Sequence, residues 1–337
     1  MIRKIIWLLA LLVLLASAGG WYISQQTEKF VQQPLTLAQE QIVTVKSGTS
    51  FQRLLTQWMA EEWIGSSPFS RLVSRLYPQL TQLKAGSYQL QPGMTLKQAL
   101  EQINSGKEHQ FAITFVEGSR FSEWQQSLAE APHLKQTITG QSEAEIAKRL
   151  SIDRDKLEGL FLAETYHYTS GTTDLEILQR AHNNLSKILD REWQQKQQKL
   201  PLGEPYDALI LASIIEKETA VDGERRRIAS VFINRLNKRM RLQTDPTVIY
   251  GMGDKYDGNI RKRDLRTPTP YNTYVISGLP PTPIAMPGEA SIAAALNPEQ
   301  SSYLYFVASG DGGHVFSKTL TEHNRAVRAY LKQLRSK

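Results

Sequence analysis

The sequence predicts an α+β protein with an N-terminal membrane helix, a small α/β module and a larger domain of mixed helices and strands. Three observations predict this class. An uncharged apolar run opens the chain, a strand–turn–helix pattern recurs after it, and amphipathic helices then give way to proline- and glycine-rich loops. The chain has 337 residues, of which 41% are hydrophobic, and this suffices for two buried cores beyond the apolar run.

The N-terminal segment, residues 1–23, is expected to be a short cytoplasmic end followed by a transmembrane anchor. Basic residues precede an uncharged apolar run at residues 5–23, and about 20 apolar residues are needed to cross a bilayer. A cleaved signal peptide is the alternative, because the small residues Ala16–Ala18 resemble a cleavage site. In either case the basic residues stay inside and the remaining chain crosses the membrane.

A recurring strand–turn–helix unit is expected to form a small module over residues 41–109, after a polar spacer at residues 24–40. Residues 43–55 and 88–100 each have a β-like lead-in, a glycine, a Ser or Thr that can cap, and an amphipathic helix. Residues 115–128 repeat the pattern more loosely. The Gly-x-Thr turn into a helix resembles LysM modules, which bind glycans rich in N-acetylglucosamine. The alternative is a generic unit that recurs because it packs well.

The remaining residues, 110–337, are expected to form the larger domain. Amphipathic periodicity predicts helices up to about residue 240, after which long loops rich in proline and glycine follow. Ordered loops on a rigid scaffold commonly carry binding sites. A glycine-rich turn between two short apolar segments predicts a β-hairpin near the C-terminus. The expected helices cover residues 143–150, 174–195, 206–218 and 223–237, and the expected hairpin strands cover 303–307 and 314–316.

Composition and motifs exclude several classes of function. The formal charge of +7 is spread along the chain without a P-loop, zinc-ligand spacing or RNA-binding motif, so nucleic acid is not an expected partner. The absence of cysteine excludes disulfide scaffolds and thiol nucleophiles. His314 follows a Gly-Gly turn, but no His or acid lies at ligand spacing from it. We therefore expect a structural hydrogen bond there, and neither a metal nor a cofactor.

Two carboxylates at the end of an apolar helix, Glu216 and Glu218, are expected to differ in environment. Glu218 continues the apolar stripe that normally packs inward, which consists of Leu211, Ile214 and Ile215. Glu216 lies roughly 200° away around the helix and is expected to point toward solvent. A carboxyl held against apolar neighbours has a raised pKa and can act as a general acid near neutral pH. The alternative is that the helix ends here and Glu218 leans into water.

Six segments of the larger domain, taken in order, resemble a known family. They read "ASIIEKETA", "VFINRL", "RLQTDPTVIYG", "TPYNTY", "GLPPTPIAMPG" and "YLYFVASGDGGHVFSKTLTEHN". Together they closely resemble the endolytic murein transglycosylases of bacteria, the MltG-type family, and the resemblance extends over nearly the whole chain. It implies that the catalytic acid is the second glutamate of "IIEKE", which is Glu218. The position of this residue on the apolar stripe indicates the same side chain independently.

The resemblance implies an enzyme of the lyase class, a lytic transglycosylase. Such an enzyme cuts the β-1,4 bond from N-acetylmuramic acid to N-acetylglucosamine inside nascent peptidoglycan strands and so ends their elongation. Glu218 would first protonate the leaving oxygen and then, once ionised, act as base for the substrate's own C6 hydroxyl, leaving a 1,6-anhydromuramoyl end. The family also implies peptidoglycan synthases (penicillin-binding proteins) as partners. It implies a single-pass protein of the bacterial inner membrane with a periplasmic catalytic domain, residues 110–337.

Five polar side chains are the candidates for substrate binding. Gln243 and Thr244 lie beside a predicted helix start, where they can bond sugar hydroxyls or acetamido groups. Tyr271, Asn272 and Tyr274 place an amide between two aromatic rings, which suits stacking on sugars. Asn272 is the candidate for bonding an acetamido group. The alternative is a proline-ordered turn that packs the two tyrosines into the core.

Two other functions stay open. The first is a non-catalytic LysM-type protein that binds the wall, in which Glu218 is only structural. The second is a muramidase that uses water. Most glycosidases use two carboxylates, so a muramidase should have a second one near Glu218, and Glu224 and Asp245 are the places to look. Asp245 otherwise has a structural explanation as the cap of a helix that begins with Pro246.

Overall fold

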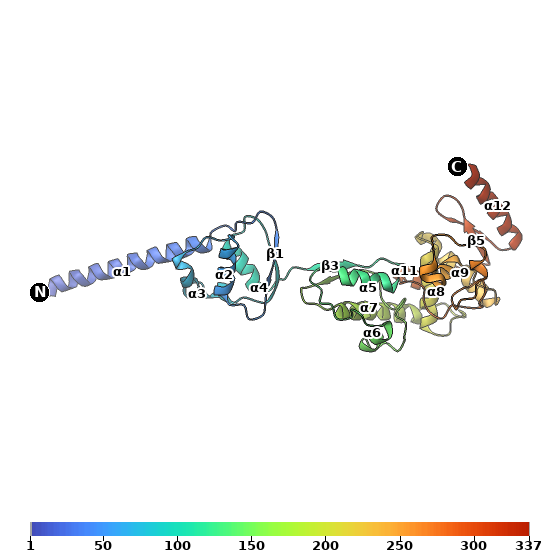
Figure 1. Cartoon of the computed structure of the whole chain (residues 1–337), viewed down its shortest axis with the longest axis horizontal. Coiled ribbons are helices and arrows are strands. Elements are labelled where there is room, and N and C mark those ends of the chain that lie inside the picture. Colours follow the sequence, from blue (N-terminus) through green and yellow to red (C-terminus); the bar gives the residue numbers. More distant parts are fainter. Residues whose placement is uncertain (1, 337) are drawn as a thin grey trace. The chain divides into compact units, whose positions relative to one another are not determined.

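The protein has a mixed α+β fold with a long apolar helix at its N-terminus, as the computed structural model of residues 2–336 shows (Figure 1). The chain divides into two compact units. The first comprises Met1–Phe111 and His167–Gly171, and the second comprises Ala112–Tyr166 and Thr172–Lys337. The four-part domain division expected from the sequence stays a prediction.

Helix α1, Ile2–Val31, is long and apolar enough to span a membrane, and it is the one such helix among the described residues. Side chains of its apolar run are exposed, which fits a membrane anchor. The helix continues past residue 23 into the expected spacer, where Phe30, Val31 and Leu35 are buried in the core of the first unit. Part of the spacer is therefore ordered, because its apolar side chains complete a small core.

The first unit is built from two strand–turn–helix repeats, as the sequence predicts. Strand β1, Gln41–Val45, leads to helix α2, Phe51–Ala60, and strand β2, Gly86–Leu90, leads to helix α4, Leu96–Ser105. The two strands pair in antiparallel register. Three short helices connect the repeats, namely η1 (Pro68–Leu72), α3 (Val73–Leu76) and η2 (Pro78–Thr81).

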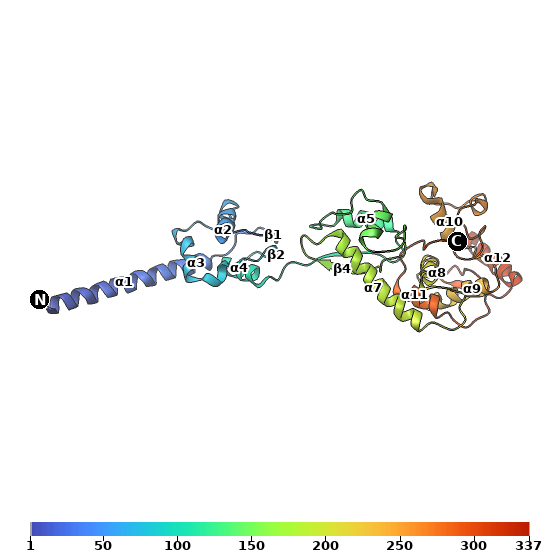
Figure 2. The ribbon, with the colours of Figure 1, turned by 90° about the horizontal axis from the view of Figure 1, so that it is seen from below.

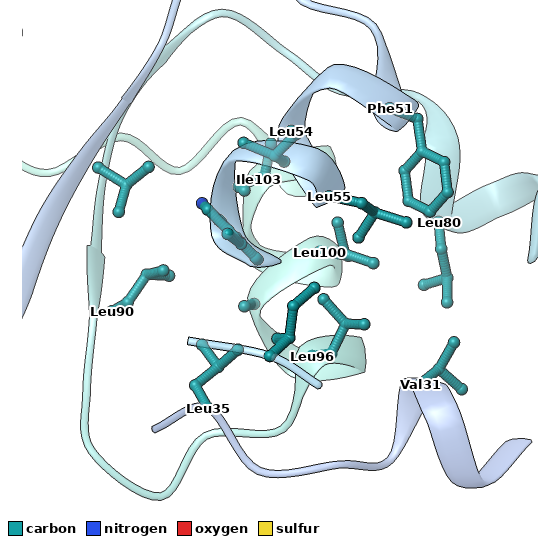
Figure 3. Packing of buried hydrophobic residues seen from close by; sticks show 14 of the residues in the cluster. Val31, Leu35, Phe51, Leu54, Leu55, Leu80, Leu90, Leu96, Leu100 and Ile103 are labelled. Atoms are coloured by element: carbon teal, nitrogen blue, oxygen red, sulfur yellow. The ribbon is translucent and has the colours of Figure 1, made fainter. Parts of the chain in front are cut away.

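Local capping explains why both helices of the repeats begin where they do. The Ser50 hydroxyl accepts a hydrogen bond from the N–H of Arg53, and Thr95 forms a capping box with Gln98. The apolar faces of the helices then meet in a single core, in which Trp58 is fully buried. Figure 3 shows the side chains that α1, α2, β2 and α4 contribute to it, among them Val31, Leu55, Leu90 and Leu100.

The second unit surrounds helix α8, Pro205–Glu218, with other helices (Figure 2). Helices α7 (Asp174–Gln194), α9 (Arg225–Asn237) and α11 (Glu289–Leu296) all pack on α8. The predicted hairpin is present as strands β5 (Tyr305–Ala308) and β6 (His314–Ser317), and helix α12 (Leu320–Ser336) packs on it. The other elements are β3 (Phe111–Thr114), α5 (Phe121–Glu130), α6 (Glu143–Arg149), β4 (Thr165–Tyr168), η3 (Asp222–Glu224), α10 (Asp245–Met252), η4 (Gly253–Lys255) and η5 (Asp264–Arg266).

Candidate active site

A cleft of about 410 Å³ in the second unit contains Glu218. It forms where the end of α8, the loop between α9 and α10, the β5–β6 hairpin and the start of α12 come together. Three of the substrate-binding candidates, Gln243, Thr244 and Tyr274, line it together with Glu218, whereas Tyr271 and Asn272 do not. The lining residues are Glu218, Arg235, Leu242, Gln243, Thr244, Asp245, Tyr274, Tyr305, Phe306, Leu320, His323 and Asn324.

Glu218 is the last residue of α8 and is partly exposed to the cleft, but protein atoms surround its carboxyl. The Thr244 hydroxyl donates a hydrogen bond to Oε1, while no described residue bonds Oε2. Burial raises the pKa of Glu218 to about 7, although the Thr244 hydrogen bond opposes this rise. Asp245 raises the pKa as well, whereas His314 and Arg235 lower it. A carboxyl that retains a proton near neutral pH is suited to general acid catalysis.

The side chain of Glu216 is buried, and the prediction that it points toward solvent is wrong. Its side chain is 6% exposed and lies 3.6 Å from the guanidinium of Arg225. The backbone N–H of Gly288 donates to its carboxylate at 2.9 Å. Neighbouring Lys217 is exposed but donates to the carbonyl of Gly118 at 3.0 Å. These contacts tie the last turn of α8 to three other segments, so that Glu216 is a structural residue.

The error about Glu216 arises because α8 has no solvated face along most of its length. All residues of 208–215 are buried, so the helix is enclosed on every side by its neighbours. A helix that is apolar all round gives no periodic signal of inside and outside. The two glutamates differ in their partners instead. A positive charge and a backbone N–H hold Glu216, whereas an uncharged hydroxyl bonds Glu218.

Arg235 holds the loop that carries Gln243 and Thr244 into the cleft. Its guanidinium donates to the carbonyl oxygens of Leu304 at 2.6 Å and Leu242 at 2.8 Å. Gln243 has a φ of 52°, which is unfavourable for a residue other than glycine. Because Arg235 bonds the backbone carbonyl of Leu242, which directly precedes Gln243, it holds the loop in this shape despite the unfavourable φ.

A second carboxylate, Asp245, lines the same cleft as Glu218. Thr244 occupies the N-cap position of α10 and Asp245 is the first helical residue, so Asp245 is not the cap that the sequence suggests. The hydroxyl of Tyr274 instead donates to its carboxylate at 2.6 Å. The cleft therefore contains one carboxyl of raised pKa and one further acid, which is bonded by a tyrosine.

Asn272 lies outside the cleft and its polar atoms are engaged by the protein. It is 1% exposed. Its side-chain amide donates to the carbonyl oxygens of Asp264 at 3.1 Å and Thr267 at 2.8 Å, and its Oδ1 accepts from the N–H of Tyr274 at 3.0 Å. Tyr271 bonds the hydroxyl of Thr282 at 2.9 Å. That these two residues bind sugar stays a prediction, and their contacts indicate that they order the loop instead.

His314 makes the structural hydrogen bond expected of it. Its Nδ1 lies 2.7 Å from a carboxylate oxygen of Glu224, and its backbone N–H donates to the other oxygen at 2.9 Å. Both carboxylate oxygens of Glu224 are therefore engaged by His314, and Glu224 does not line the cleft. Among residues 2–336, no group of His, Cys, Asp or Glu is arranged to hold a metal ion.

Several residues of the cleft were not singled out from the sequence, namely Arg235, Tyr305 and His323. His323 stacks on Tyr305, with 5.2 Å between ring centroids. Burial and the charge of Arg235 lower the pKa of His323 below its usual value, so its imidazole is neutral near pH 7 and can accept a hydrogen bond. A signal was available, because the sixth segment that carries the family resemblance, "YLYFVASGDGGHVFSKTLTEHN", contains Tyr305 and ends on His323 and Asn324.

A further buried carboxyl, Glu158, lies away from the cleft. It is 5% exposed and accepts hydrogen bonds from the N–H of Phe121 at 3.0 Å and the hydroxyl of Tyr250 at 3.2 Å. Burial raises the pKa of Glu158 to about 7, although these two hydrogen bonds oppose the rise. Because Glu158 does not line the cleft, we expect its titration to affect stability.

The chain is similar in sequence to two named bacterial proteins and in fold to a solved structure. The endolytic murein transglycosylase of Bacillus subtilis is 35% identical over 274 residues, which cover 76% of this chain and 75% of that protein. The endolytic murein transglycosylase of Streptococcus pneumoniae is 29% identical over 286 residues, and this match spans 74% of this chain but only 51% of the pneumococcal protein. The crystal structure of a YceG-like protein from Listeria monocytogenes is similar in fold, with a TM-score of 0.52 and 34% identity over 85% of this chain and 98% of that one.

The family assignment rests on most of the chain. The YceG-like family matches residues 43–329, which include all but the first two residues of the strand–turn–helix repeats of the first unit and every residue that lines the Glu218 cleft. The resemblance carried by the six sequence segments is thereby confirmed. The chain belongs to the YceG-like family.

Proposed function

We propose that this chain is a membrane-anchored endolytic lytic transglycosylase that cuts the β-1,4 bond between N-acetylmuramic acid and N-acetylglucosamine. The observation that carries the proposal is Glu218, an acid of raised pKa in a cleft, with an uncharged hydroxyl as its hydrogen-bonding partner. The name of the Bacillus subtilis relative supports the same activity. Cleavage inside nascent strands would end their elongation.

In the proposed reaction, protonated Glu218 donates its proton to the glycosidic oxygen, and the bond from that oxygen to the anomeric carbon breaks. The C6 hydroxyl of the same muramic ring attacks the anomeric carbon and gives its proton to the carboxylate of Glu218. The acid is regenerated, water is not consumed, and the strand ends in 1,6-anhydromuramic acid. Because the C6 hydroxyl is tethered to the ring, it has a large effective-concentration advantage over solvent.

Gln243, Thr244 and Tyr274 are the proposed contacts to the sugars, since they line the cleft beside Glu218. Thr244 also bonds Glu218, so its main role is to set the proton affinity of the acid. Tyr305 presents an aromatic ring in the same cleft, and such a ring suits stacking on a sugar face.

The first unit is proposed to bind glycan as a LysM-like module, residues 41–109, while α1 anchors the chain in the membrane with both units on the outer side. Association with peptidoglycan synthases is proposed from the family resemblance. Deleting residues 41–109 should weaken binding to glycan strands more than it slows cleavage at saturating substrate, because Glu218 stays in place. Complete loss of activity in a deletion variant that circular dichroism shows to be folded would contradict a separable binding role.

A muramidase that uses water is the second candidate, and Asp245 is the observation that favours it. A carboxylate in the same cleft could activate water for attack on the anomeric carbon. Asp245 and Glu218 are the acids among the residues that line the cleft, so the activation of water would fall to Asp245. The Tyr274 hydroxyl already donates a hydrogen bond to the carboxylate of Asp245, which limits this role.

Two variants test the proposal through mass spectrometry of digested murein. Glu218→Gln should fold and bind but leave no cleavage products, because an amide cannot protonate the leaving oxygen. Asp245→Asn should cut more slowly and still give anhydro ends. Full activity of Glu218→Gln would contradict the proposal, and loss of all activity in Asp245→Asn together with reducing ends from the wild type would favour the muramidase.

A further inference from the structure

A second cavity of the same unit, about 270 Å³ in volume, lies at the end of α10 that is remote from Glu218. Its walls come from the last turn of α10 and from the loop that follows, including η5. Three basic residues and one acidic residue line it, namely Lys255, Arg261, Arg263 and Asp264. We call it the basic cavity. An excess of positive charge in a concave site attracts anions.

The positive charge of the basic cavity is only partly compensated. Arg261 donates to both carboxylate oxygens of Asp257, at 3.3 and 2.5 Å, so its charge is neutralised. Arg263 is largely exposed and lies 3.6 Å from the carboxylate of Asp264. Lys255 has no ion-pair partner among the residues that the structure describes. Lys255 and Arg263 are therefore the side chains able to bind an anion.

Asn272 builds one wall of the basic cavity. This buried residue lines the cavity and bonds the carbonyl oxygens of Asp264 and Thr267 on the neighbouring loop. Its Oδ1 accepts from the backbone of Tyr274, which lines the Glu218 cleft. The basic cavity is thus part of the fold, and Asn272 is one link between it and the cleft.

Helix α10 sets the separation between the cleft and the basic cavity. Asp245 in its first turn lines the cleft, and Gly251 and Met252 in its last turn line the cavity. The helix has 8 residues, and a rise of about 1.5 Å per residue gives a length of about 12 Å. A short flexible substituent on a sugar near the cleaved bond can extend over this distance.

We propose that the basic cavity binds a carboxylate of a peptide attached to the glycan strand. The inference rests on the proposed function, because murein strands carry peptides with free carboxylates. Lys255 and Arg263 would form charge-assisted hydrogen bonds with this group. Binding a group remote from the reacting bond holds the strand in register without any contact to Glu218. The site makes strands with acidic peptides the preferred substrates.

Two murein oligosaccharides of equal length test the proposal, one with free peptide carboxylates and one in which these are amidated. Their binding is measured on the full chain in detergent with the Glu218→Gln substitution, which prevents turnover. The free-carboxylate form should bind about ten-fold more tightly, because two exposed charged contacts each contribute several-fold. The additional double substitution Lys255→Gln and Arg263→Gln should remove this preference. Both side chains are on the surface, so the fold should be unaffected.

A matched control replaces Lys262 and Arg266 by Gln. These are exposed basic residues of the same loop that do not line the basic cavity, and the preference should persist without them. Equal binding of the two oligosaccharides to the Glu218→Gln chain without loop substitutions would overturn the proposal. Loss of the preference in the control would overturn it as well.

Competition by inorganic pyrophosphate distinguishes between two anionic ligands of the basic cavity. One is a peptide carboxylate, and the other is the lipid-linked pyrophosphate end of a growing strand. If pyrophosphate competes with both oligosaccharides while amidation has no effect, the assignment to a peptide carboxylate is wrong. Failure of the wild type to cut either oligosaccharide would contradict the proposed function, whereas the binding comparison would still decide the role of the basic cavity.

Discussion

Replacing Thr244 by Val removes the hydrogen bond that this residue donates to Glu218. Val retains the shape of the side chain and the backbone N–H, which bonds the hydroxyl of Thr273 at 3.1 Å. A hydrogen bond to a charged group contributes about 1.5 kcal/mol or more, and about 1.4 kcal/mol corresponds to one pKa unit. Since this hydrogen bond opposes the rise in the pKa of Glu218, the variant should have a pKa about one unit higher than the wild type.

The pH dependence of kcat/KM for cleavage of a murein oligosaccharide measures this shift. A general acid must be protonated, so activity falls as the pH rises through the pKa of Glu218. In Thr244→Val this fall should move up by about one pH unit, and at about pH 8 the variant should retain several times more of its own maximal activity than the wild type does. Thr244→Ser keeps a hydroxyl and should leave the profile in place. A profile that is unchanged or moves down in Thr244→Val would refute the reasoning.

Two further predictions concern stability. The folded-state pKa of Glu158 is about 7 and lies above its unfolded value, so its contribution is fully present below about pH 4.5 and is lost as the pH rises through about 7. The free energy of unfolding of Glu158→Gln, relative to that of the wild type, should therefore rise by up to about 3 kcal/mol from about pH 5 to about pH 8. Thermal unfolding measures this difference, and a difference that is equal at both pH values would contradict the prediction. Glu216→Gln should lower stability by about 1–3 kcal/mol, because it removes the negative charge beside buried Arg225. The exposed neighbour substitution Lys217→Gln should cost less than about 1 kcal/mol, and the reverse order would contradict the burial of Glu216.

The parts of the fold that depend on local chemistry could be predicted from the sequence. Ser50 and Thr95 cap the two helices of the first unit because a hydroxyl before an apolar helix satisfies its free N–H groups. The extent of α8 follows from its unbroken apolar run. A raised pKa for Glu218 was predicted from its place on the apolar stripe, and burial raises this pKa to about 7. Its position in a cleft was not predicted, and it lines the cleft as the last residue of α8.

The parts that depend on distant contacts could not be predicted in this way. Glu216 is buried because Arg225 and the N–H of Gly288 satisfy its charge, and neither partner is visible in the helix itself. The local sequence predicts that the amide of Asn272 binds a sugar, but its N–H groups donate to the carbonyl oxygens of Asp264 and Thr267. The contribution of α12 to the cleft, through His323, arises from tertiary packing that no local pattern specifies.

Cleavage in water labelled with oxygen-18 tests most directly whether the substrate's own C6 hydroxyl attacks once Glu218 has protonated the leaving oxygen. The full chain digests murein in labelled water, and mass spectrometry of the new muramic ends records both the label and the loss of one water relative to a hydrolysed end. Unlabelled anhydro ends are predicted for the wild type, with no new ends from Glu218→Gln. Reducing ends that carry one labelled oxygen would contradict the transglycosylase mechanism and would favour a muramidase.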